Sequence, residues 1–546
     1  MTGLIETAGR PLGLSIPVIL REPSEFDLPS TAEVLASGGD ARIALDPRTA
    51  ANKYGCLSQP DPAIAAFGSS TASTISEPAY AAADWLRHRL AALADTEPRQ
   101  VTYAREMRRI RTELSHLCGV SGFPGLDIVF AASGTDLHLL IAQLTGGTNP
   151  GRSLAVMVEA SETGTGVPAA LAGCHFSNRA PLGDTIAEGA PVRDGTIEVA
   201  AVPCRAADGT PRSAAALDGE VASLVTAAAM SGRKVLLTLV DVSKTGAIVP
   251  SIGCALGLQR RFPQMVDVLV DACQFRLAPA TLHAYLEQGF MVALTGSKFL
   301  SGPAFSGAVM VPGPVARRLR GQPLPPALRA YSARADWPQG WAAPRGLPDI
   351  ANYGLLLRWE AALYELRAFH AVPDHEVTEI LMEFAQAVQS RLATNPIFDP
   401  LPVPMLDRRS LTGKTSWDQI PTIFPFLLRR PTLGGGFDPL SRAETEHVFK
   451  LLDSDASGYL GLPAAGARSR VAALRCQVGQ PVACGERDGV QVSALRLCVS
   501  ARLVVEAAHA GSEIVISRAM AALDKVALLA RESACSVNPI RVARQG

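Results

Sequence analysis

Between residues 126 and 312 the chain repeats one pattern, a short apolar run followed by a stretch with helical spacing. The apolar runs, rich in Val, Ala and Leu, are LDIVFAAS, SLAVMVEAS, EVAAVPC, KVLLTLVDVS, DVLVDACQ, MVALTGSKF and FSGAVMVP. Continuous apolar runs are typical of strands buried on both faces, and helical crossovers between them favour parallel pairing. The sequence therefore predicts an α/β fold with a mainly parallel seven-stranded sheet flanked by helices.

Two of the seven runs end in side chains that carry chemistry, Asp271 in the fifth run and Lys298 in the sixth. Because function gathers at the carboxyl ends of parallel strands, we expect both side chains at one edge of the sheet. A lysine amine forms a Schiff base with an aldehyde, and a carboxylate keeps a pyridine nitrogen protonated, which suits pyridoxal 5'-phosphate. A lone pair of this kind is more often a helix cap and a solvated lysine.

The sequence around this pair carries a family resemblance. The segments DACQ (271–274), TGSKF (295–299) and GP (302–303) resemble, in order and spacing, the class V aminotransferase group of fold type I pyridoxal-phosphate enzymes. That group also includes cysteine desulfurases, selenocysteine lyases and kynureninases. The resemblance implies that pyridoxal 5'-phosphate is the cofactor.

The resemblance also implies roles for single residues. Lys298 carries the cofactor aldehyde, Asp271 pairs with the pyridine nitrogen, and Gln274 lies near the phenolic oxygen. Lys298 and Asp271 are the predicted catalytic residues, and Lys298 also serves as the base that moves the Cα proton. Ser297 departs from the pattern, because cysteine desulfurases usually have His before the lysine.

The first apolar run leads into the sequence SGTD, which begins at Ser133 and is followed by a helical stretch. Glycine lets the backbone approach closely, and a helix N-terminus offers free amides and partial positive charge, which suits a phosphate. The same sequence fits an ordinary helix N-cap. In this position it resembles the family's phosphate cup, so Ser133, Gly134 and Thr135 are predicted cofactor ligands, with Thr295 and Ser297 as second contributors.

Two further turns are candidates for contacts with the cofactor ring. Residues 161–166 (SETGTG) lie where the family places the side chain that covers the ring face, but they include no aromatic residue. Glu162 or Thr163 is left as a guess for that position. Residues 241–246 (DVSKTG) resemble the family's turn before the Asp-bearing strand, and Ser243 is a further predicted cofactor contact.

Near the C-terminus the segment SALRLCVS (493–500) reads as a strand that carries Arg496. Class V enzymes have an Arg on a C-terminal strand that binds the substrate's α-carboxylate, a task suited to the planar fork of guanidinium donors. Arg496 is therefore the predicted substrate-binding residue. Arg475, Arg487 and Arg502 are rivals, and an Arg paired with a surface carboxylate is the plain alternative.

The composition of the chain limits the kinds of molecule that it is expected to bind. The chain has 546 residues, 48% of them hydrophobic, with 51 basic and 51 acidic side chains, which predicts a large core and more than one domain. A net charge of zero gives no electrostatic argument for nucleic acid or an anionic membrane, so a small-molecule amino-acid substrate fits better. We find no leader pattern or membrane-length run and expect a cytoplasmic protein.

Metal sites and disulfides are not expected. The ten cysteines are scattered without C-x-x-C spacing, which favours reduced thiols. Residues 453–458 (DSDASG) mimic the opening of a calcium loop, but Ala464 stands where the closing Glu is required. We interpret this segment as a turn.

Changes in amino-acid composition and periodicity divide the chain into an N-terminal arm (1–80), a large cofactor-binding domain (81–335) and a smaller C-terminal α+β domain (336–546). The hydroxyl run at residues 69–71 of the arm is a candidate for the substrate pocket, although a plain surface loop is the first expectation. The Pro- and Arg-rich residues 313–346 are interpreted as a connection that leaves the large domain. The resemblance further implies a homodimer.

The reaction type is the least constrained inference. Our first hypothesis is an aminotransferase that acts on a small amino acid. Alternatives are a lyase or decarboxylase that cleaves a C–C or C–S bond on the same scaffold, or a non-catalytic binding protein with this fold. In selenocysteine-lyase-like relatives the sulfur-attacking Cys lies two residues before a Gln-Pro pair; Val478 stands there, which disfavours sulfur transfer through a protein thiol.

Overall fold

A computed structural model of the protein describes residues 28–146 and 150–532. Its largest sheet has the order β2-β9-β8-β7-β5-β3-β4, with a short β6 (Ile248–Val249) paired to β5. In chain order, the seven main strands are β2 (Asp127–Ala131), β3 (Ser153–Val158), β4 (Glu198–Val202), β5 (Lys234–Asp241), β7 (Val266–Ala272), β8 (Met291–Thr295) and β9 (Gly307–Val311). All seven predicted strands are confirmed.

The sheet is mainly parallel, as predicted. Strands β8, β7, β5, β3 and β4 run in parallel, whereas β9 pairs antiparallel with both β2 and β8. The chain enters β9 from β8 through residues 296–306, and this short loop contains no helix that could reverse its direction. The carboxyl ends of the five parallel strands therefore share one edge with the start of β9.

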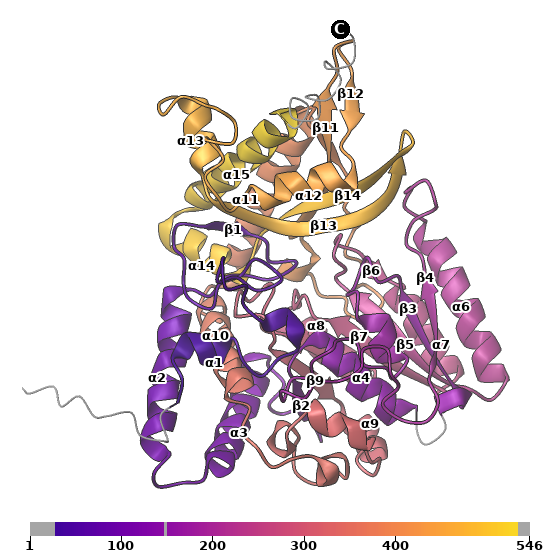
Figure 1. Ribbon diagram of the computed structural model, residues 1–546. Coiled ribbons are helices and arrows are strands. Elements are labelled where there is room, and N and C mark those ends of the chain that lie inside the picture. Colours follow the sequence, from indigo (N-terminus) through magenta and orange to yellow (C-terminus); the bar gives the residue numbers. More distant parts are fainter. Residues whose placement is uncertain (1–27, 147–149, 533–546) are drawn as a thin grey trace, which may run out of the picture.

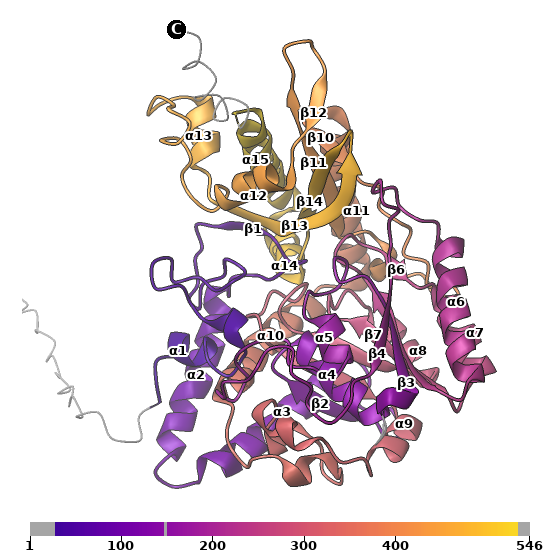
Figure 2. The same cartoon turned by 45° about the vertical axis from the view of Figure 1, so that its right-hand side comes forward.

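Helices cover both faces of this sheet (Figures 1 and 2). Side chains alternate along the strands, so Ile128 and Phe130 of β2 pack in one apolar cluster while Val129 and Ala131 pack in the other. One cluster takes in α6 (Ala214–Met230), α7 (Ile252–Arg261) and α8 (Pro279–Glu287), and the other takes in α4 (Gly134–Thr145), α5 (Val167–Leu171) and α9 (Gly313–Leu319).

A helical group lies beside the sheet and holds the arm. Its members are α1 (Thr31–Leu35), α2 (Glu77–Leu93), α3 (Arg99–Leu117) and the long α10 (Tyr353–His370), which packs on the other three. Arg358 of α10 is buried and donates to the carbonyl oxygens of Leu35 (3.0 Å), Gly38 (2.9 Å) and Phe305 (2.7 Å). One side chain thus ties the arm to the loop that follows Lys298.

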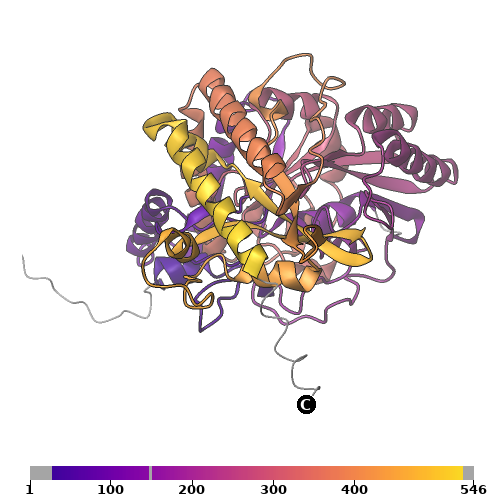
Figure 3. The same cartoon turned by 90° about the horizontal axis from the view of Figure 1, so that it is seen from above.

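A second sheet covers the carboxyl edge of the first, with the order β1-β13-β14-β11-β10. Its strands are β1 (Ala65–Phe67), β10 (Phe398–Pro400), β11 (Ile423–Pro431), β13 (Cys476–Arg487) and β14 (Val490–Cys498), with β12 (Phe437–Pro439) paired to β11. Around it lie α11 (Asp374–Thr394), α12 (Arg442–Lys450), α13 (Ala467–Ala473), α14 (Ala501–Ala510) and α15 (Ser512–Glu532). Helices α11 and α15 lie side by side across the top (Figure 3).

Strand β1 joins the arm to this second sheet, because it pairs in parallel with β13 through Ala65 and Cys476. The division at residues 80 and 335 stays a proposal, and within it the arm supplies an edge strand to the C-terminal domain. This pairing holds the arm across the edge where the parallel strands end.

Residues 313–346 are not a bare connection, and that prediction is wrong. They form α9 and the short helices η3 (Pro326–Ala330), η4 (Arg334–Asp336) and η5 (Ala343–Gly346). Trp337 and Trp341 are buried in the same apolar cluster as α4. Prolines end regular helices, but they do not stop the aromatic residues between them from packing.

Residues 1–27, 147–149 and 533–546 lie outside the described part, and so do the leader prediction and Cys535. Of the helices that are described, none is both long and apolar enough to cross a membrane.

Candidate active site

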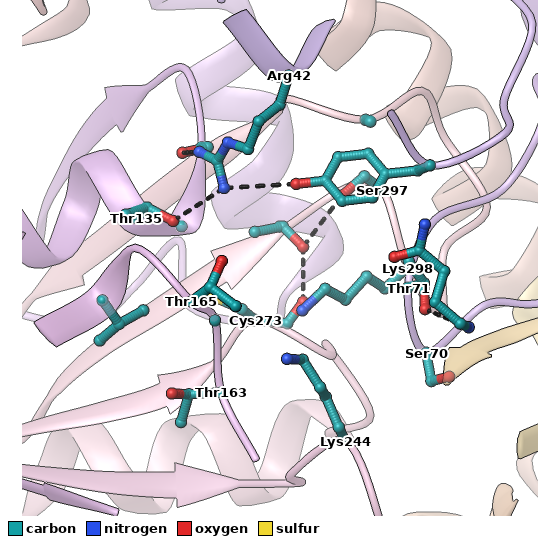
Figure 4. A pocket seen from close by; sticks show the side chains of 18 of the residues that line it. Arg42, Ser70, Thr71, Thr135, Thr163, Thr165, Lys244, Cys273, Ser297 and Lys298 are labelled. Atoms are coloured by element: carbon teal, nitrogen blue, oxygen red, sulfur yellow. Dashed lines mark hydrogen bonds between the residues drawn. The ribbon is translucent and has the colours of Figure 1, made fainter. Parts of the chain in front are cut away.

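A cavity of about 260 Å³ lies where the parallel strands end and the second sheet covers them. Its wall comes from the arm, from the loops after β2, β3, β5, β7 and β8, and from β13 and β14. Figure 4 shows the lysine side chains of Lys298 and Lys244 pointing into this space. The two residues predicted as catalytic, Lys298 and Asp271, both line it.

Lys298 lies in a tightly packed turn after β8. Gly302 N donates to Gly296 O (2.9 Å) and Ser301 N donates to Lys298 O (3.0 Å), which closes the turn. A Cβ on Gly296 would lie 2.4 Å from the Cβ of Ala362 in α10, so only glycine fits against that helix. The backbone of Lys298 is therefore held while its side chain reaches into the cavity.

Asp271 is buried near the end of β7, and His138 of α4 approaches it. The distance between His138 Nε2 and Asp271 Oδ2 is 3.4 Å, and His138 Nδ1 donates to Gly134 O (2.7 Å). Burial raises the pKa of Asp271, but the charges of His138 and Lys298 outweigh it and hold that pKa below its usual range. Burial lowers the pKa of His138, and the facing carboxylate raises it on balance. The geometry favours an anionic Asp271 beside a cationic imidazole.

His138 was not predicted from the sequence, although a signal was present. It lies four residues after Gly134 in α4, so both residues are on the same face of that helix. Since Gly134 was already assigned to the cavity, helical spacing alone places His138 beside it.

Ser133 is the N-cap of α4, and its hydroxyl accepts a hydrogen bond from Asp136 N (3.3 Å). The ordinary N-cap interpretation is therefore correct, and it coexists with the predicted anion site, because Ser133, Gly134 and Thr135 also line the cavity. A Cβ on Gly134 would lie 2.7 Å from Cys273 Sγ. Only glycine therefore fits against Cys273 at this position.

Arg42 from the arm reaches this helix N-terminus, as Figure 4 shows. Its Nη2 donates to Ser133 Oγ (3.2 Å) and its Nη1 donates to Thr135 Oγ1 (3.3 Å). Asp40 forms an ion pair with it (2.6 Å), which fixes the guanidinium. Burial acts to lower the pKa of Arg42, but Asp40 raises it on balance. A cation, two hydroxyls and a helix N-terminus together are suited to bind an anion.

The second predicted contributors to this anion site also lie in the cavity wall. Thr295 Oγ1 donates to Cys273 O (2.6 Å), and Ser297 Oγ donates to Thr295 Oγ1 (3.4 Å). Thr295 is thus committed to the backbone, while Ser297 keeps acceptor capacity toward the cavity.

Two predicted cofactor contacts do not line the cavity. Gln274 donates through Nε2 to Ser70 O (3.0 Å), and its Oε1 is buried without a hydrogen-bond partner. Ser243 Oγ donates to Glu162 Oε2 (2.7 Å) behind the turn that carries Lys244. Each of these residues therefore positions a neighbour that does line the cavity, Ser70 in one case and Lys244 in the other.

The two candidates for the ring-covering residue, Glu162 and Thr163, point in different directions from the turn after β3. Glu162 points away from the cavity, where it accepts from Thr245 Oγ1 (2.8 Å) and Arg205 Nη2 (2.9 Å). Thr163 lines the cavity, and its Oγ1 is buried without a hydrogen-bond partner. Thr163 is the better candidate of the two for contact with a ring.

Arg496 of β14 is buried at the cavity wall. Its Nη2 donates to Thr71 Oγ1 (3.1 Å), its Nη1 lies 3.5 Å from Lys244 O, and its Nε has no hydrogen-bond partner. Burial lowers the pKa of Arg496. A buried guanidinium with an unused donor is suited to bind a carboxylate.

The three rival arginines do not line this cavity. Arg475 pairs with Asp61 (2.9 Å), and Arg502 pairs with Glu365 (2.8 Å). Arg487 donates to Asp208 O (2.7 Å). Arg496 alone among the four faces the cavity.

The hydroxyl run of the arm is not a plain surface loop, so that first expectation is wrong. Ser69 and Ser70 are buried, and Ser70 and Thr71 line the cavity beside Arg496. The buried Arg276 donates to Ser69 Oγ (2.9 Å) and to Val499 O (3.0 Å), which fixes the run against the second sheet.

Comparison with known proteins gives information on the fold alone. No protein-family model and no curated protein matches the sequence. The solved complex of the cystine C–S lyase C-DES with its reaction product, cysteine persulfide, is 15% identical, with a TM-score of 0.51, over 86% of this chain and 97% of that one. The cysteine desulfurase CsdA from Escherichia coli is 15% identical over 85% and 95%, with a TM-score of 0.46.

A NifS-like protein from Rickettsia africae is 10% identical over 84% of this chain and 98% of its own, with a TM-score of 0.45. The likeness to the cystine C–S lyase extends over nearly the whole of both chains. It confirms the α/β fold that the resemblance implies. The chain therefore has the fold of that lyase, a large sheet flanked by helices with a second sheet above it.

Proposed function

We propose that this protein is a pyridoxal-phosphate-dependent enzyme that acts on a small amino acid. One observation supports this most strongly. Lys298 and Asp271 come from the ends of neighbouring parallel strands and line one cavity, together with a built anion site at the N-terminus of α4. An amine, a carboxylate and an anion site are the three contacts that this cofactor requires.

The residues present fit the cofactor. Three polar atoms of residues in the cavity wall are buried without hydrogen-bond partners: Thr163 Oγ1, Ser70 Oγ and Arg496 Nε. A bound ligand could form hydrogen bonds with them. When bound, pyridoxal 5'-phosphate supplies a conjugated ring that accepts electrons from the substrate's Cα.

The chain's own residues then have distinct tasks. Arg42, Ser133 and Thr135 with the amides of α4 would hold the phosphate. Asp271, kept anionic by His138, holds a proton on the pyridine nitrogen. Lys298 would hold the aldehyde through Nζ, and its amine would afterwards move the proton at the substrate's Cα.

Amino transfer remains our first proposal for the reaction, and a C–S lyase is the second. The second is supported by the cystine C–S lyase, whose fold the chain shares. Cys273 is the one cysteine of the described residues that lines the cavity, and burial raises its pKa well above the usual value. A thiol held neutral is a poor nucleophile, so a lyase that needs no protein thiol fits better than a desulfurase that uses one.

A spectroscopic screen tests the function. Purified protein loaded with pyridoxal 5'-phosphate is mixed with each amino acid in turn while the cofactor absorbance is recorded. An aminotransferase converts the cofactor to its amine form, whereas a lyase releases ammonia, or sulfide from a sulfur amino acid, and leaves the cofactor absorbance unchanged after turnover. A protein that neither binds the cofactor nor responds to any amino acid contradicts the proposal.

We expect Arg496→Lys to raise the Michaelis constant for the amino acid by about tenfold or more, because a point ammonium cannot replace two parallel hydrogen bonds worth roughly 1.5–3 kcal/mol. Cofactor affinity should change little. Steady-state kinetics and cofactor titration measure the two effects. Arg502→Lys is the matched control, since Arg502 lies outside the cavity. Normal substrate binding by Arg496→Lys would show that Arg496 is structural.

We also propose a cytoplasmic homodimer. The dimer rests on the family resemblance, and the location on the cysteines, since all nine in the described part are free thiols. Light scattering measures the oligomeric state, and a fully active monomer would contradict the dimer.

A further inference from the structure

The cavity holds more positive charge than the proposed chemistry uses. Its charged wall residues are the carboxylate of Asp271 with its partner His138, and the cations Arg42, Lys53, Lys244, Lys298 and Arg496. Phosphate binding accounts for Arg42, cofactor attachment for Lys298 and the α-carboxylate for Arg496. Lys244 and Lys53 remain, and neither forms an ion pair with a described residue.

The turn that carries Lys244 is held from behind. Glu162 O accepts from Lys244 N (2.9 Å), and the Glu162 carboxylate accepts from Ser243 Oγ (2.7 Å) and Thr245 N (3.1 Å). Arg205 neutralises that carboxylate (2.9 Å). The backbone on both sides of Lys244 is therefore fixed, and its side chain alone reaches the cavity (Figure 4).

The Lys244 ammonium has little to bind in the protein itself. Its nearest acceptor is Ala160 O at 3.5 Å, a long contact. The guanidinium of Arg496 lies on the same side of the cavity, with Nη1 3.5 Å from Lys244 O. Lys53 is exposed and lines the same cavity. Arg496 and Lys244 are thus neighbouring cations in the cavity wall.

We propose that Lys244 binds a second carboxylate of the substrate, so that the enzyme acts on an amino acid with an acidic side chain rather than a neutral one. This inference rests on the proposed function, in which Arg496 takes the α-carboxylate. Beside it, Lys244 offers up to three donors at a fixed backbone position. A neutral side chain there would leave the buried ammonium with only its long contact to Ala160 O, whereas a carboxylate satisfies it.

The charges that face Lys244 make the binding sensitive to pH. Burial, Arg496 of β14 and Lys298 beyond β8 lower the pKa of Lys244 to about 7, against the opposing effects of Glu162 beyond β3 and Asp271 of β7. A carboxylate bound to Lys244 favours the ammonium and so raises this pKa. Binding therefore takes up a proton near and above neutrality. Affinity for a dicarboxylate is full below about pH 7 and falls as the pH rises through the raised pKa of the complex.

Calorimetry with simple acids tests the inference without turnover. Glutarate has two carboxylates, butyrate has one, and neither has an amine that could react with the cofactor. On the protein loaded with pyridoxal 5'-phosphate at pH 6.5, we expect glutarate to bind about tenfold or more tightly than butyrate. Titrations at pH 8 in buffers of different ionisation enthalpy should show proton uptake with glutarate only.

Variants assign the effect to Lys244. Lys244→Met should reduce the preference for glutarate to about twofold or less and remove the proton uptake, while Lys244→Arg should keep the preference. Lys53→Met is the matched control, since Lys53 lines the same cavity at an exposed position. Thermal unfolding of each variant shows whether it is folded.

Two outcomes overturn the inference. Equal affinity of the wild-type protein for the two acids shows that no second carboxylate site exists. A preference that survives in Lys244→Met but is lost in Lys53→Met places the site elsewhere. Either result leaves cofactor attachment at Lys298 intact, and attachment is read separately by the mass added to that lysine, so the two proposals fail in different ways.

Discussion

Replacement of Lys298 by Ala is expected to abolish turnover, with a loss of at least about 10³-fold. The amine would hold the cofactor and also move the Cα proton, and general-base catalysis alone contributes about 10²–10⁴-fold. Borohydride reduction of the loaded wild-type protein, followed by peptide mass spectrometry, should place the added mass on the peptide that contains Lys298. The Lys298→Ala protein should carry no such mass.

Lys244 makes this a demanding test, because it is a second amine in the same cavity. With its pKa lowered to about 7, a large share of Lys244 is unprotonated at neutral pH and able to attack an aldehyde. Lys298 is still expected to be the attachment site, because it follows β8, the strand that pairs with the Asp271 strand. Lys244→Ala is the matched control and should keep the added mass on Lys298. Mass found on Lys244 in the wild type would refute the assignment.

The fold was largely predictable because its signal is local. Each buried strand is a continuous apolar run, and each crossover has helical spacing, so the sheet and the positions of Asp271 and Lys298 follow from the period of the pattern. The antiparallel course of β9 was not anticipated, since its apolar run looks like those of the parallel strands. The packing of Trp337 and Trp341 was missed because proline-rich sequence was read as a connection.

The cavity was predictable only in part, because the part of its wall that comes from the arm and from β13 and β14 depends on tertiary pairing. Arg42 and Thr71 reach it because β1 pairs with β13, a contact between segments about 400 residues apart that no local pattern shows. Gln274 was expected at the ring, but the chain turns at Phe275, whose φ is +53°, and the amide donates to the arm. Side-chain direction in such a turn cannot be read from spacing.

Asp271→Asn is the second large effect that we expect. The variant should still attach the cofactor to Lys298 but lose activity by about 3 kcal/mol or more of transition-state stabilisation, since a neutral amide cannot keep the pyridine nitrogen protonated. Reduction and mass spectrometry measure the attachment, and kcat/KM measures the loss. Asp267→Asn is the matched control on the same strand, because Asp267 lies outside the cavity and pairs with Arg318.

The pH dependence of the wild type separates this role from a structural one. Because His138 and Lys298 outweigh burial and hold the pKa of Asp271 below its usual range, the carboxylate stays ionised through the pH range where an ordinary aspartate would be protonated. Its contribution is present above that range and is lost only as the pH falls through the lowered pKa. Activity measured down to about pH 3.5, where an ordinary aspartate is largely protonated, should therefore show no step from Asp271.

Replacing His138 should raise the pKa of Asp271, because the charge of the imidazole is the largest of those that lower this pKa. In His138→Asn the opposing effect of burial gains weight, so the pKa of Asp271 rises and the acid limb of the kcat/KM profile should move to higher pH. Asp271→Asn with near wild-type activity, or His138→Asn with an unshifted acid limb, would mean that the pair serves packing alone.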